Sequence, residues 1–189
     1  ELRKRGGGLF GSSPLTGSLN VITINLPRIG YLSKNEDDFI ERLNDLLDLA
    51  KEAHIIKRKV INDFTDKGMY PYTSFYLQDV KKRTGSCWSN HFNTVGVIGM
   101  DDACQNLFGC SIGEEKGKAF ALRVMNHVRD RLIEFQEETG LLFNLEATPG
   151  EGCSYSLALK DKKKYPNILT KIGECGTPFY TNSTHLPVN

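Results

Sequence analysis

The sequence has no apolar run of 18 residues, no CxxC pair and almost no net charge, and each absence excludes a class of protein. Without the apolar run, a typical membrane-spanning helix is not expected. The 24 basic and 23 acidic residues leave a net charge of +1, which argues against binding nucleic acid by broad electrostatic attraction. The first residues lack the apolar core of a signal peptide. The cysteine pattern described next fits a reducing, cytoplasmic compartment, which is our expectation.

The cysteines form no recognisable framework. Their odd number and wide spacing argue against a set of disulfides: Cys87, Cys104, Cys110, Cys153 and Cys175. A zinc ribbon or thioredoxin-like motif would need a CxxC pair. Cys87 and His91 could share a helix face, but two ligands do not make a structural metal site. We therefore expect free thiols and no metal ligands within this chain.

Buried strands alternate with helices along the chain. Apolar, β-branched runs predict strands at 20–26, 93–99 and 141–147. Amphipathic or capped segments predict helices at about 33–65, 101–109, 116–138 and from 152 onward. This alternation favours parallel pairing and a single α/β domain.

The longest of these segments predicts a helix that ends near residue 65. Ser33 and Glu36 have the spacing of a capping box, and Asn35 is an alternative cap. Its apolar stripe carries one polar member, Lys57, and consists of Phe39, Leu43, Leu46, Leu47, Ala50, Ala53, Ile56, Val60, Ile61 and Phe64. A helix of this length must extend past the sheet or support another subunit.

The stretch "NLEATPGEGCSYS" places a Gly-rich turn, residues 148–152, between a strand and a helix. Two glycines let the backbone approach an anion closely, and the following helix adds a partial positive charge. An ordinary strand-to-helix loop also carries Gly and Pro, and Glu151 would repel a phosphate unless it points away. From the residues alone, an anion site and an ordinary loop both remain open.

Other candidate motifs are weaker. "GEEKGKA", from Gly113, has its glycines one residue too close for a P-loop, and Ala119 replaces the hydroxyl residue that holds magnesium. "GVIG" at 96–99 suggests only close packing. The histidines form no catalytic set, and we expect His54 and His127 at a surface or boundary. Two acidic pairs, Asp37-Asp38 and Asp101-Asp102, fall at helix starts, where the helix dipole explains them.

Four segments, taken in order, resemble the anaerobic, class III ribonucleoside-triphosphate reductases, which are glycyl-radical enzymes. The segments are "RKRGGGLFGSSPLTGSLNVITINLPRIGYL", "FNTVGVIGMDDACQNLFG", "FQEETGLLFNLEATPGEGCSYSLALKDKKKYP" and "PFYTNSTHLPV". The similarity covers nearly the whole chain and is least distinctive at residues 65–90.

The resemblance implies an α/β fold that is part of a ten-stranded barrel of two parallel half-sheets. It implies reduction of ribonucleoside triphosphates by a thiyl radical that removes hydrogen from the 3′ carbon, after which the 2′ hydroxyl leaves. The radical would be stored on a glycine installed by an iron–sulfur activase that uses S-adenosylmethionine. ATP and dNTP effectors, and a homodimer of the full-length protein, are also implied.

The same resemblance implies that residues 1–189 are an internal segment of one catalytic domain. The radical cysteine would precede Glu1, and the glycyl-radical and zinc segments would follow Asn189. No catalytic residue and no metal ligand would then lie on this chain, which alone should not turn over. A non-catalytic nucleotide-binding or assembly module from a split or truncated reductase is the alternative.

The resemblance implies that residues 1–189 supply one wall of the substrate site. The "ATPGEG" turn resembles the family's "ATPAEG" element and would contact substrate phosphates through backbone N–H groups of Thr148, Pro149, Gly150, Glu151, Gly152, Cys153 and Ser154, although Pro149 itself has no N–H to donate. Residues bordering the cavity would be Asn25, Asn182, Ser183, Thr184 and His185. A glycine at 150, a cysteine at 153 and a serine at 156 depart from the family pattern. Ser18 stands near where some members use an asparagine for formate, so a redoxin-type reductant remains open.

Overall fold

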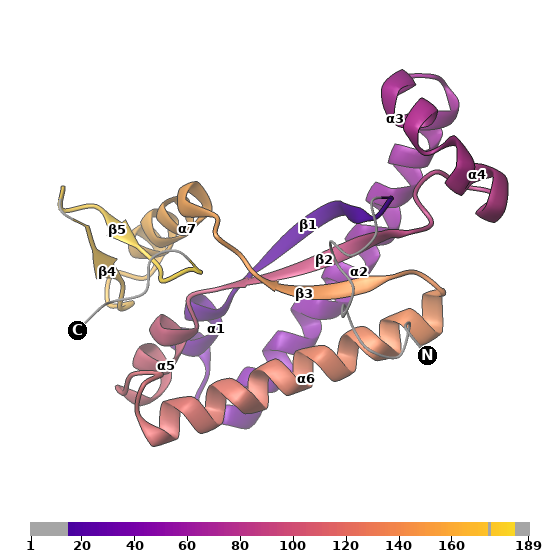
Figure 1. Ribbon diagram of the computed structural model, residues 1–189. Helices are drawn as coiled ribbons and strands as arrows, with labels where there is room; N and C mark the ends of the chain where they lie inside the picture. The colour runs from indigo at the N-terminus through magenta and orange to yellow at the C-terminus, as the bar shows by residue number, and fades with distance from the viewer. Residues whose placement is uncertain (1–14, 174, 184–189) are drawn as a thin grey trace. The chain divides into compact units, whose positions relative to one another are not determined.

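The computed structural model describes residues 15–173 and 175–183, and its elements are labelled in Figure 1. Three strands form the main sheet in the order β1-β2-β3, with bounds Gly17–Asn25, His91–Ile98 and Phe143–Ala147. The helices are α1 (Leu26–Leu32), α2 (Glu36–Asp66), α3 (Pro71–Tyr76), α4 (Gln78–Thr84), α5 (Met100–Phe108), α6 (Glu115–Thr139) and α7 (Glu151–Lys164). A short antiparallel pair, β4 (Lys171–Ile172) and β5 (Pro178–Phe179), lies near the end of the described chain.

The main sheet is parallel, as the alternation of strands and helices predicts. Asn93 N–H donates to the Leu142 carbonyl at 2.9 Å, and Thr148 N–H donates to the Val97 carbonyl at 3.1 Å. The residue number of the partner on or beside β3 therefore rises as the residue number along β2 rises, which means that the two strands are parallel. The three predicted strands are confirmed, each within a few residues of its predicted bounds.

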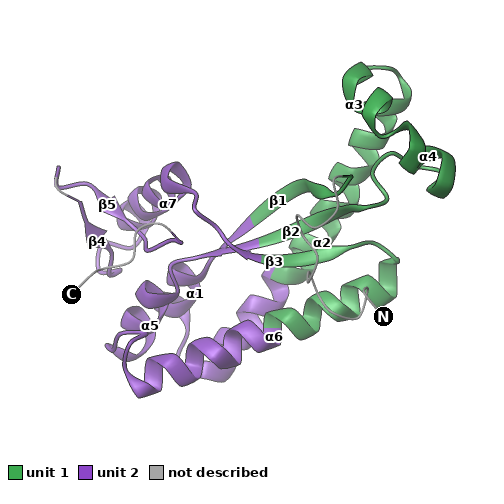
Figure 2. Cartoon of the chain, in the orientation of Figure 1, with its two compact units in different colours: residues 1–22, 47–95, 128–145 green, residues 23–46, 96–127, 146–189 purple. Residues whose placement is uncertain are grey.

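Contacts between Cα atoms divide the chain into two compact units, coloured in Figure 2. Unit 1 comprises residues 1–22, 47–95 and 128–145, and unit 2 comprises residues 23–46, 96–127 and 146–189. The turn, α7 and the β4–β5 pair all belong to unit 2. Among the helices described, none combines the length and the apolar character needed to cross a bilayer.

Helix α1 was not predicted, and its first turn explains why. A proline directly after the predicted strand 20–26 indicates only that the strand ends, but Pro27 lies in the first turn of α1, where its missing N–H costs nothing. Gly30 then lets α1 approach α5, because a Cβ at this position would lie 2.6 Å from the Ala103 carbonyl oxygen. The short β4 and β5 strands also escaped prediction, since two residues carry no periodicity.

Helix α2 begins with the alternative cap. Asp38 N–H donates to Asn35 Oδ1 at 2.9 Å, and Lys34 N–H donates back to Asp38 Oδ2 at 2.9 Å. Ser33 instead donates its hydroxyl to the Ile29 carbonyl at the end of α1. The cap is therefore Asn35, and the prediction of a Ser33–Glu36 capping box is wrong.

The buried face of the C-terminal half of α2 carries polar side chains. His54 is fully buried and Arg58 is 7% exposed, whereas Ile56 is 62% exposed. The predicted apolar stripe is therefore wrong beyond Ala50, and so is a surface or boundary position for His54. The strands beneath explain the change, because Asn20 and Asn93 offer side-chain oxygens that bond to His54 and Arg58.

The prediction for α6 is confirmed in full. The five residues of its predicted stripe are at most 2% exposed: Phe120, Val124, Val128, Leu132 and Phe135. Gly140 follows with φ 68°, and its N–H donates to the Gln136 carbonyl, as a left-handed cap requires. His127 is half-buried, with Nε2 2.7 Å from Asn44 Oδ1, in keeping with a boundary position.

Candidate functional site

The predicted anion turn lies between β3 and α7. Gly150 precedes the helix with φ 8° and ψ 58°, and the first helical bond runs from Ser154 N–H to the Gly150 carbonyl at 2.8 Å. The amides of Gly152 and Cys153 therefore belong to the first turn, where helical N–H groups have no acceptor within the helix. The helix dipole adds partial positive charge at the same end.

The turn packs closely on the neighbouring strand. A Cβ at Gly96 would overlap the Thr148 hydroxyl and would lie 3.2 Å from the Thr23 hydroxyl. Only glycine at this position of β2 leaves room for Thr148 where the chain leaves β3. The "GVIG" motif is thus explained by close packing, as predicted, and Gly96 holds the first residue of the turn in place.

The polar loop after β5 reaches the same turn. Ser183 N–H lies 3.4 Å from the Thr148 carbonyl. Ser154 donates its hydroxyl to the Tyr180 carbonyl at 2.5 Å and accepts from Tyr180 N–H at 2.9 Å. The structure therefore brings the turn and the Asn182-Ser183 loop together, although they are about 30 residues apart in sequence. Thr184 and His185 lie outside the described residues.

The side chain of Ser154 is 1% exposed and fully engaged with Tyr180. It serves to attach the loop to α7 and has no remaining surface for a ligand. Its backbone N–H is also used, in the first bond of the helix. Among the predicted phosphate contacts, Gly152 and Cys153 thus have the better placed amides. Glu151, the first residue of α7, is exposed.

Asn25 is anchored to α7 by a carboxylate that the sequence analysis missed. Asp161 is fully buried and accepts from Asn25 Nδ2 at 2.8 Å, from Arg28 Nε at 2.7 Å and from the Tyr180 hydroxyl at 2.9 Å. Burial, together with the Asp161 carboxylate, raises the pKa of Tyr180 far above its ordinary value, so its hydroxyl stays a donor. This cluster fixes α7 against the end of β1 and the loop that carries Asn182.

Nothing in the sequence distinguishes Asp161 from its neighbours. It stands in the run "LKDKKK", which has the composition of a solvated helix face. The hydrogen-bond partners come from segments more than 130 residues earlier and about 20 residues later. Only the steps from Ser154 to Ala158 and from Ala158 to Asp161, of four and three residues, could have suggested that Asp161 lies on the inward face of the helix.

Two further buried carboxylates brace the same region. Asp102 accepts from Thr181 N–H and from the Thr181 hydroxyl, both at 2.7 Å, and burial raises its pKa. Asp101 accepts from Ser111, Ile112 N–H and Lys171 at 2.9 Å each. Burial opposes its charge, but these three donors hold the pKa of Asp101 below its ordinary value. Both aspartates lie in the first turn of α5, in keeping with the predicted position at a helix start, and both also hold distant segments by hydrogen bonds.

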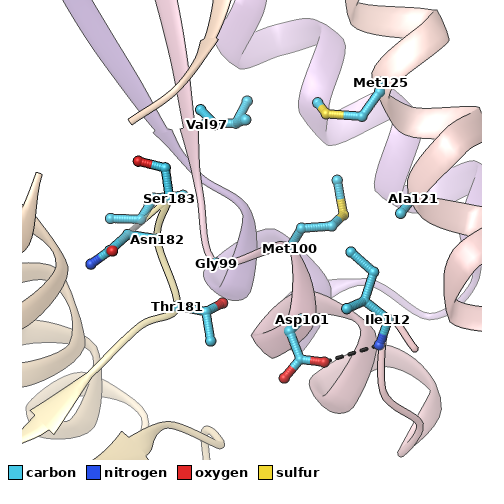
Figure 3. A pocket seen from close by; sticks show the side chains of 12 residues that line it. Val97, Gly99, Met100, Asp101, Ile112, Ala121, Met125, Thr181, Asn182 and Ser183 are labelled. Atoms are coloured by element: carbon cyan, nitrogen blue, oxygen red, sulfur yellow. Dashed lines mark hydrogen bonds between the residues drawn. The ribbon is translucent and has the colours of Figure 1, made fainter. Parts of the chain in front are cut away.

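A cavity of about 400 Å³ lies within unit 2 beside the loop, and Figure 3 shows its walls. In that view, Met100 and Met125 lie on one side of it, while Asn182 and Ser183 lie on the other. Its lining is mostly apolar and consists of Val97, Ile98, Gly99, Met100, Asp101, Ile112, Ala121, Met125, Ala147, Thr181, Asn182 and Ser183. Ala147 directly precedes the turn, so the cavity adjoins it.

The thiols and histidines build no reactive cluster in the part of the chain that the structure describes. No group of three or more His, Cys, Asp or Glu side chains is placed to hold a metal ion there. The five cysteines are free. Burial raises the pKa of Cys104 to about 12, so it remains a protonated thiol. Cys153, in the first turn of α7, is half-buried.

Comparison with protein families matches residues 1–189 to the model described as "Anaerobic ribonucleoside-triphosphate reductase". The match covers the entire chain.

This chain belongs to the anaerobic ribonucleoside-triphosphate reductase family.

Individual relatives agree with that assignment. The anaerobic ribonucleoside-triphosphate reductase of Haemophilus influenzae is 28% identical over 182 residues, covering 90% of this chain and 25% of the relative. The phage T4 enzyme is 29% identical over 189 residues, covering 90% of this chain and 28% of the relative. The chain thus spans about a quarter of the length of the reductases it matches.

Solved structures give the same result. The anaerobic ribonucleotide reductase of Thermotoga maritima, with citrate in the active site, has a TM-score of 0.69 and 25% identity. That match covers 89% of this chain and 30% of the Thermotoga chain. The same enzyme in complex with dATP and CTP also has a TM-score of 0.69 and 25% identity, with 89% and 27% covered.

Proposed function

We propose that this chain is an internal segment of the catalytic domain of an anaerobic ribonucleoside-triphosphate reductase and supplies the wall that holds the substrate phosphates. The observation that carries the proposal is the turn at the start of α7. The amides of Gly152 and Cys153 lie there before the first helical bond, at the positive end of a 14-residue helix. A triphosphate is the kind of anion that such an end binds through backbone donors.

The surrounding residues would position this turn. Gly96 and Thr23 hold Thr148 on one side, and the Ser183 amide meets its carbonyl on the other. Asp161 fixes the body of α7 to Asn25 and Arg28. Such bracing keeps the donors in one geometry, so that binding does not require the loop to be ordered first.

The fold would be completed by the rest of the longer protein. Three parallel strands followed by helices would form part of the ten-stranded α/β barrel of the family. The thiyl cysteine, the storage glycine and the zinc segment would lie outside residues 1–189. The chemistry they supply is hydrogen abstraction at the 3′ carbon of the ribose, followed by loss of the 2′ hydroxyl.

The conditions and partners of the longer protein would be those of an anaerobic reductase. Reduction of ribonucleoside triphosphates would take place in the cytoplasm of an anoxic cell, after activation by an S-adenosylmethionine-dependent iron–sulfur enzyme. The full-length protein would be a homodimer regulated by ATP and dNTP effectors; a relative from Thermotoga maritima has been solved with dATP in its specificity site. Ser18 would not bind formate readily, because its hydroxyl bonds to Thr94 at 2.6 Å, which favours a redoxin-type reductant.

Calorimetric titration of the 189-residue chain with inorganic triphosphate, and then with ribonucleoside triphosphates, tests the phosphate site. Gly152→Val should fold normally, because a Cβ at Gly152 meets nothing within 4 Å. The branched side chain should nevertheless cover the amides and weaken triphosphate binding about tenfold or more.

Gly113→Val is the matched control for this experiment. Gly113 is exposed, and a Cβ there would meet only the Ser111 hydroxyl at 3.7 Å. This variant should bind triphosphate like the wild type. Equal affinity of the Gly152→Val and wild-type chains would remove the turn from the phosphate site, and lost binding in Gly113→Val would move the site to the "GEEKGKA" loop.

A further inference from the structure

Two threonine hydroxyls face each other where the main sheet meets the turn at 148–152. Thr23 Oγ1, on β1, lies 3.4 Å from Oγ1 of Thr148, the first residue of the turn, and both side chains are half-buried. We call these two residues the hydroxyl pair. Gly96 of β2 lies beside both hydroxyls, since a Cβ there would overlap one and lie 3.2 Å from the other. The three residues belong to unit 2, so their contacts lie within one compact unit.

The two members of the hydroxyl pair bond only weakly to each other. A hydrogen bond between two oxygen atoms usually spans about 2.5–3.0 Å, so a separation of 3.4 Å is a poor contact. Each hydroxyl can donate once and accept twice. Neither side chain has a further hydrogen-bond partner among the residues that the structure describes. The pair therefore has donors and acceptors left for a ligand that carries a hydroxyl group.

The hydroxyl pair lies on the face of the sheet opposite the apolar cavity. Val97 and Ala147 line that cavity, and Figure 3 shows Val97 in its wall. Because side chains alternate between the two faces of a strand, Gly96 and Glu146 face the other way. Glu146 is half-buried and lies two residues before Thr148. Its carboxylate would repel a phosphate at this level of the sheet, whereas a neutral sugar hydroxyl meets no such repulsion. The position therefore suits the sugar of a nucleotide whose phosphates lie at the start of α7.

We propose that the hydroxyl pair binds the 2′-hydroxyl of a ribonucleoside triphosphate and so distinguishes the substrate from its 2′-deoxy product. The inference rests on the phosphate site proposed above. Four residues separate Thr148 from Gly152, at most about 14 Å of chain, which is comparable with the length of a triphosphate and its sugar. A 2′-hydroxyl both donates and accepts, as a threonine hydroxyl does, so it can bridge Thr23 and Thr148. The product lacks this hydroxyl and would be held less tightly, which favours its release.

Calorimetric titration of the 189-residue chain with ATP, 2′-deoxy-ATP and 3′-deoxy-ATP tests the hydroxyl pair. The three nucleotides share one base and one triphosphate, so the ratio of their affinities within one chain reports the sugar hydroxyls alone. The wild type should bind ATP and 3′-deoxy-ATP alike and 2′-deoxy-ATP about tenfold more weakly, the effect of one lost hydrogen bond. Thr23→Val keeps the β-branched shape and removes one hydroxyl, so the ratio for ATP and 2′-deoxy-ATP should fall about threefold or more. A merely structural effect of this variant would weaken all three nucleotides equally.

Thr177→Val is the matched control, because Thr177 is exposed in the turn between β4 and β5. This variant should keep the wild-type ratio. The sugar contact would be overturned by equal binding of ATP and 2′-deoxy-ATP to the wild type, by an unchanged ratio in Thr23→Val, or by selective loss of 3′-deoxy-ATP binding. Inorganic triphosphate separates this failure from failure of the phosphate site. A wild type that binds triphosphate without distinguishing the sugars keeps the turn as a phosphate site, whereas a wild type that binds no triphosphate loses both sites.

Discussion

At the scale of single residues, the structure gives roles to polar side chains that have no distinctive sequence context. His54 is the clearest case on α2. It is fully buried, its Nδ1 lies against Asn20 Oδ1, and burial lowers its pKa to about 4, with the nearby positive charges of Lys57 and Arg58 adding to the effect. The folded protein therefore holds this histidine neutral.

The free energy of unfolding should consequently fall as the pH drops from about 6.5 to about 4. An unfolded histidine takes up a proton near pH 6.5, whereas folded His54 does so only near pH 4. Between these values the unfolded state binds more protons, so the free energy of unfolding should fall by up to about 3 kcal/mol as the pH drops. Urea denaturation at pH 7.5 and pH 5 measures this loss.

Two variants isolate the contribution of His54. His54→Gln cannot titrate and should make the pH dependence in this window shallower. His127→Gln, on α6, should leave the dependence as in the wild type. A similar slope for wild type and His54→Gln would show that other groups cause the loss.

Asp161 makes a second prediction at this scale. Asp161→Asn removes the buried negative charge to which Arg28, Asn25 and Tyr180 donate hydrogen bonds. We expect the free energy of unfolding to fall by about 3 kcal/mol, the usual cost of breaking a buried, hydrogen-bonded charge cluster. Lys163→Gln, an exposed change on the same helix, should cost little. Chemical denaturation of both variants makes the comparison, and equal stabilities would contradict the role assigned to Asp161.

At the scale of elements, close approach between segments depends on a few glycines. Gly30 allows α1 to lie against α5, and Gly96 allows Thr148 to pack on β2. The sequence predicts close packing at "GVIG" but does not identify the segment that packs there, and "RIGYL" gives no sign of the contact at Gly30. The ranges of the three main strands and of α2, α5, α6 and α7, in contrast, follow from apolar periodicity and caps.

Gly30→Ala should weaken the contact between α1 and α5. Its Cβ would lie 2.6 Å from the Ala103 carbonyl oxygen and 3.0 Å from Ala103 Cα, so the two helices must separate. Overpacking of this kind costs about 1–3 kcal/mol. Thermal unfolding should show a lower melting temperature than for Gly113→Ala, where the added methyl meets only a flexible hydroxyl. A Gly30→Ala variant as stable as the control would show that the helices can separate without cost.

At the scale of the whole molecule, the chain is about a quarter of the length of the reductases it matches. Its effect on catalysis must therefore be measured in the longer protein. If the turn binds phosphates in the ground state and the transition state alike, Gly152→Val in the activated, full-length reductase should raise KM for the nucleoside triphosphate. The turnover number should change far less. Anoxic steady-state assays separate the two, and a lowered turnover number at unchanged KM would contradict a phosphate-binding role.

The sequence by itself determined the three main strands, the helices α2, α5, α6 and α7, the parallel pairing, the α6 core stripe and, through four resembling blocks, the family, whereas it did not predict α1, α3, α4, β4 or β5. These depend on local periodicity, on caps and on residue order, all of which are present along the chain. Only the tertiary structure decided that α2 buries His54 and Arg58 while exposing Ile56, and that Asp161 braces the start of α7. Those outcomes depend on hydrogen-bond partners in other segments, 30 or more residues away for His54 and Arg58 and more than 130 residues away for Asn25 and Arg28 on Asp161, and such partners leave no mark on local spacing. The turn at 148–152 shows both contributions. Its glycines and the following helix were predicted from the sequence. Only the structure shows that Gly96, Tyr180 and Ser183 hold the turn in place.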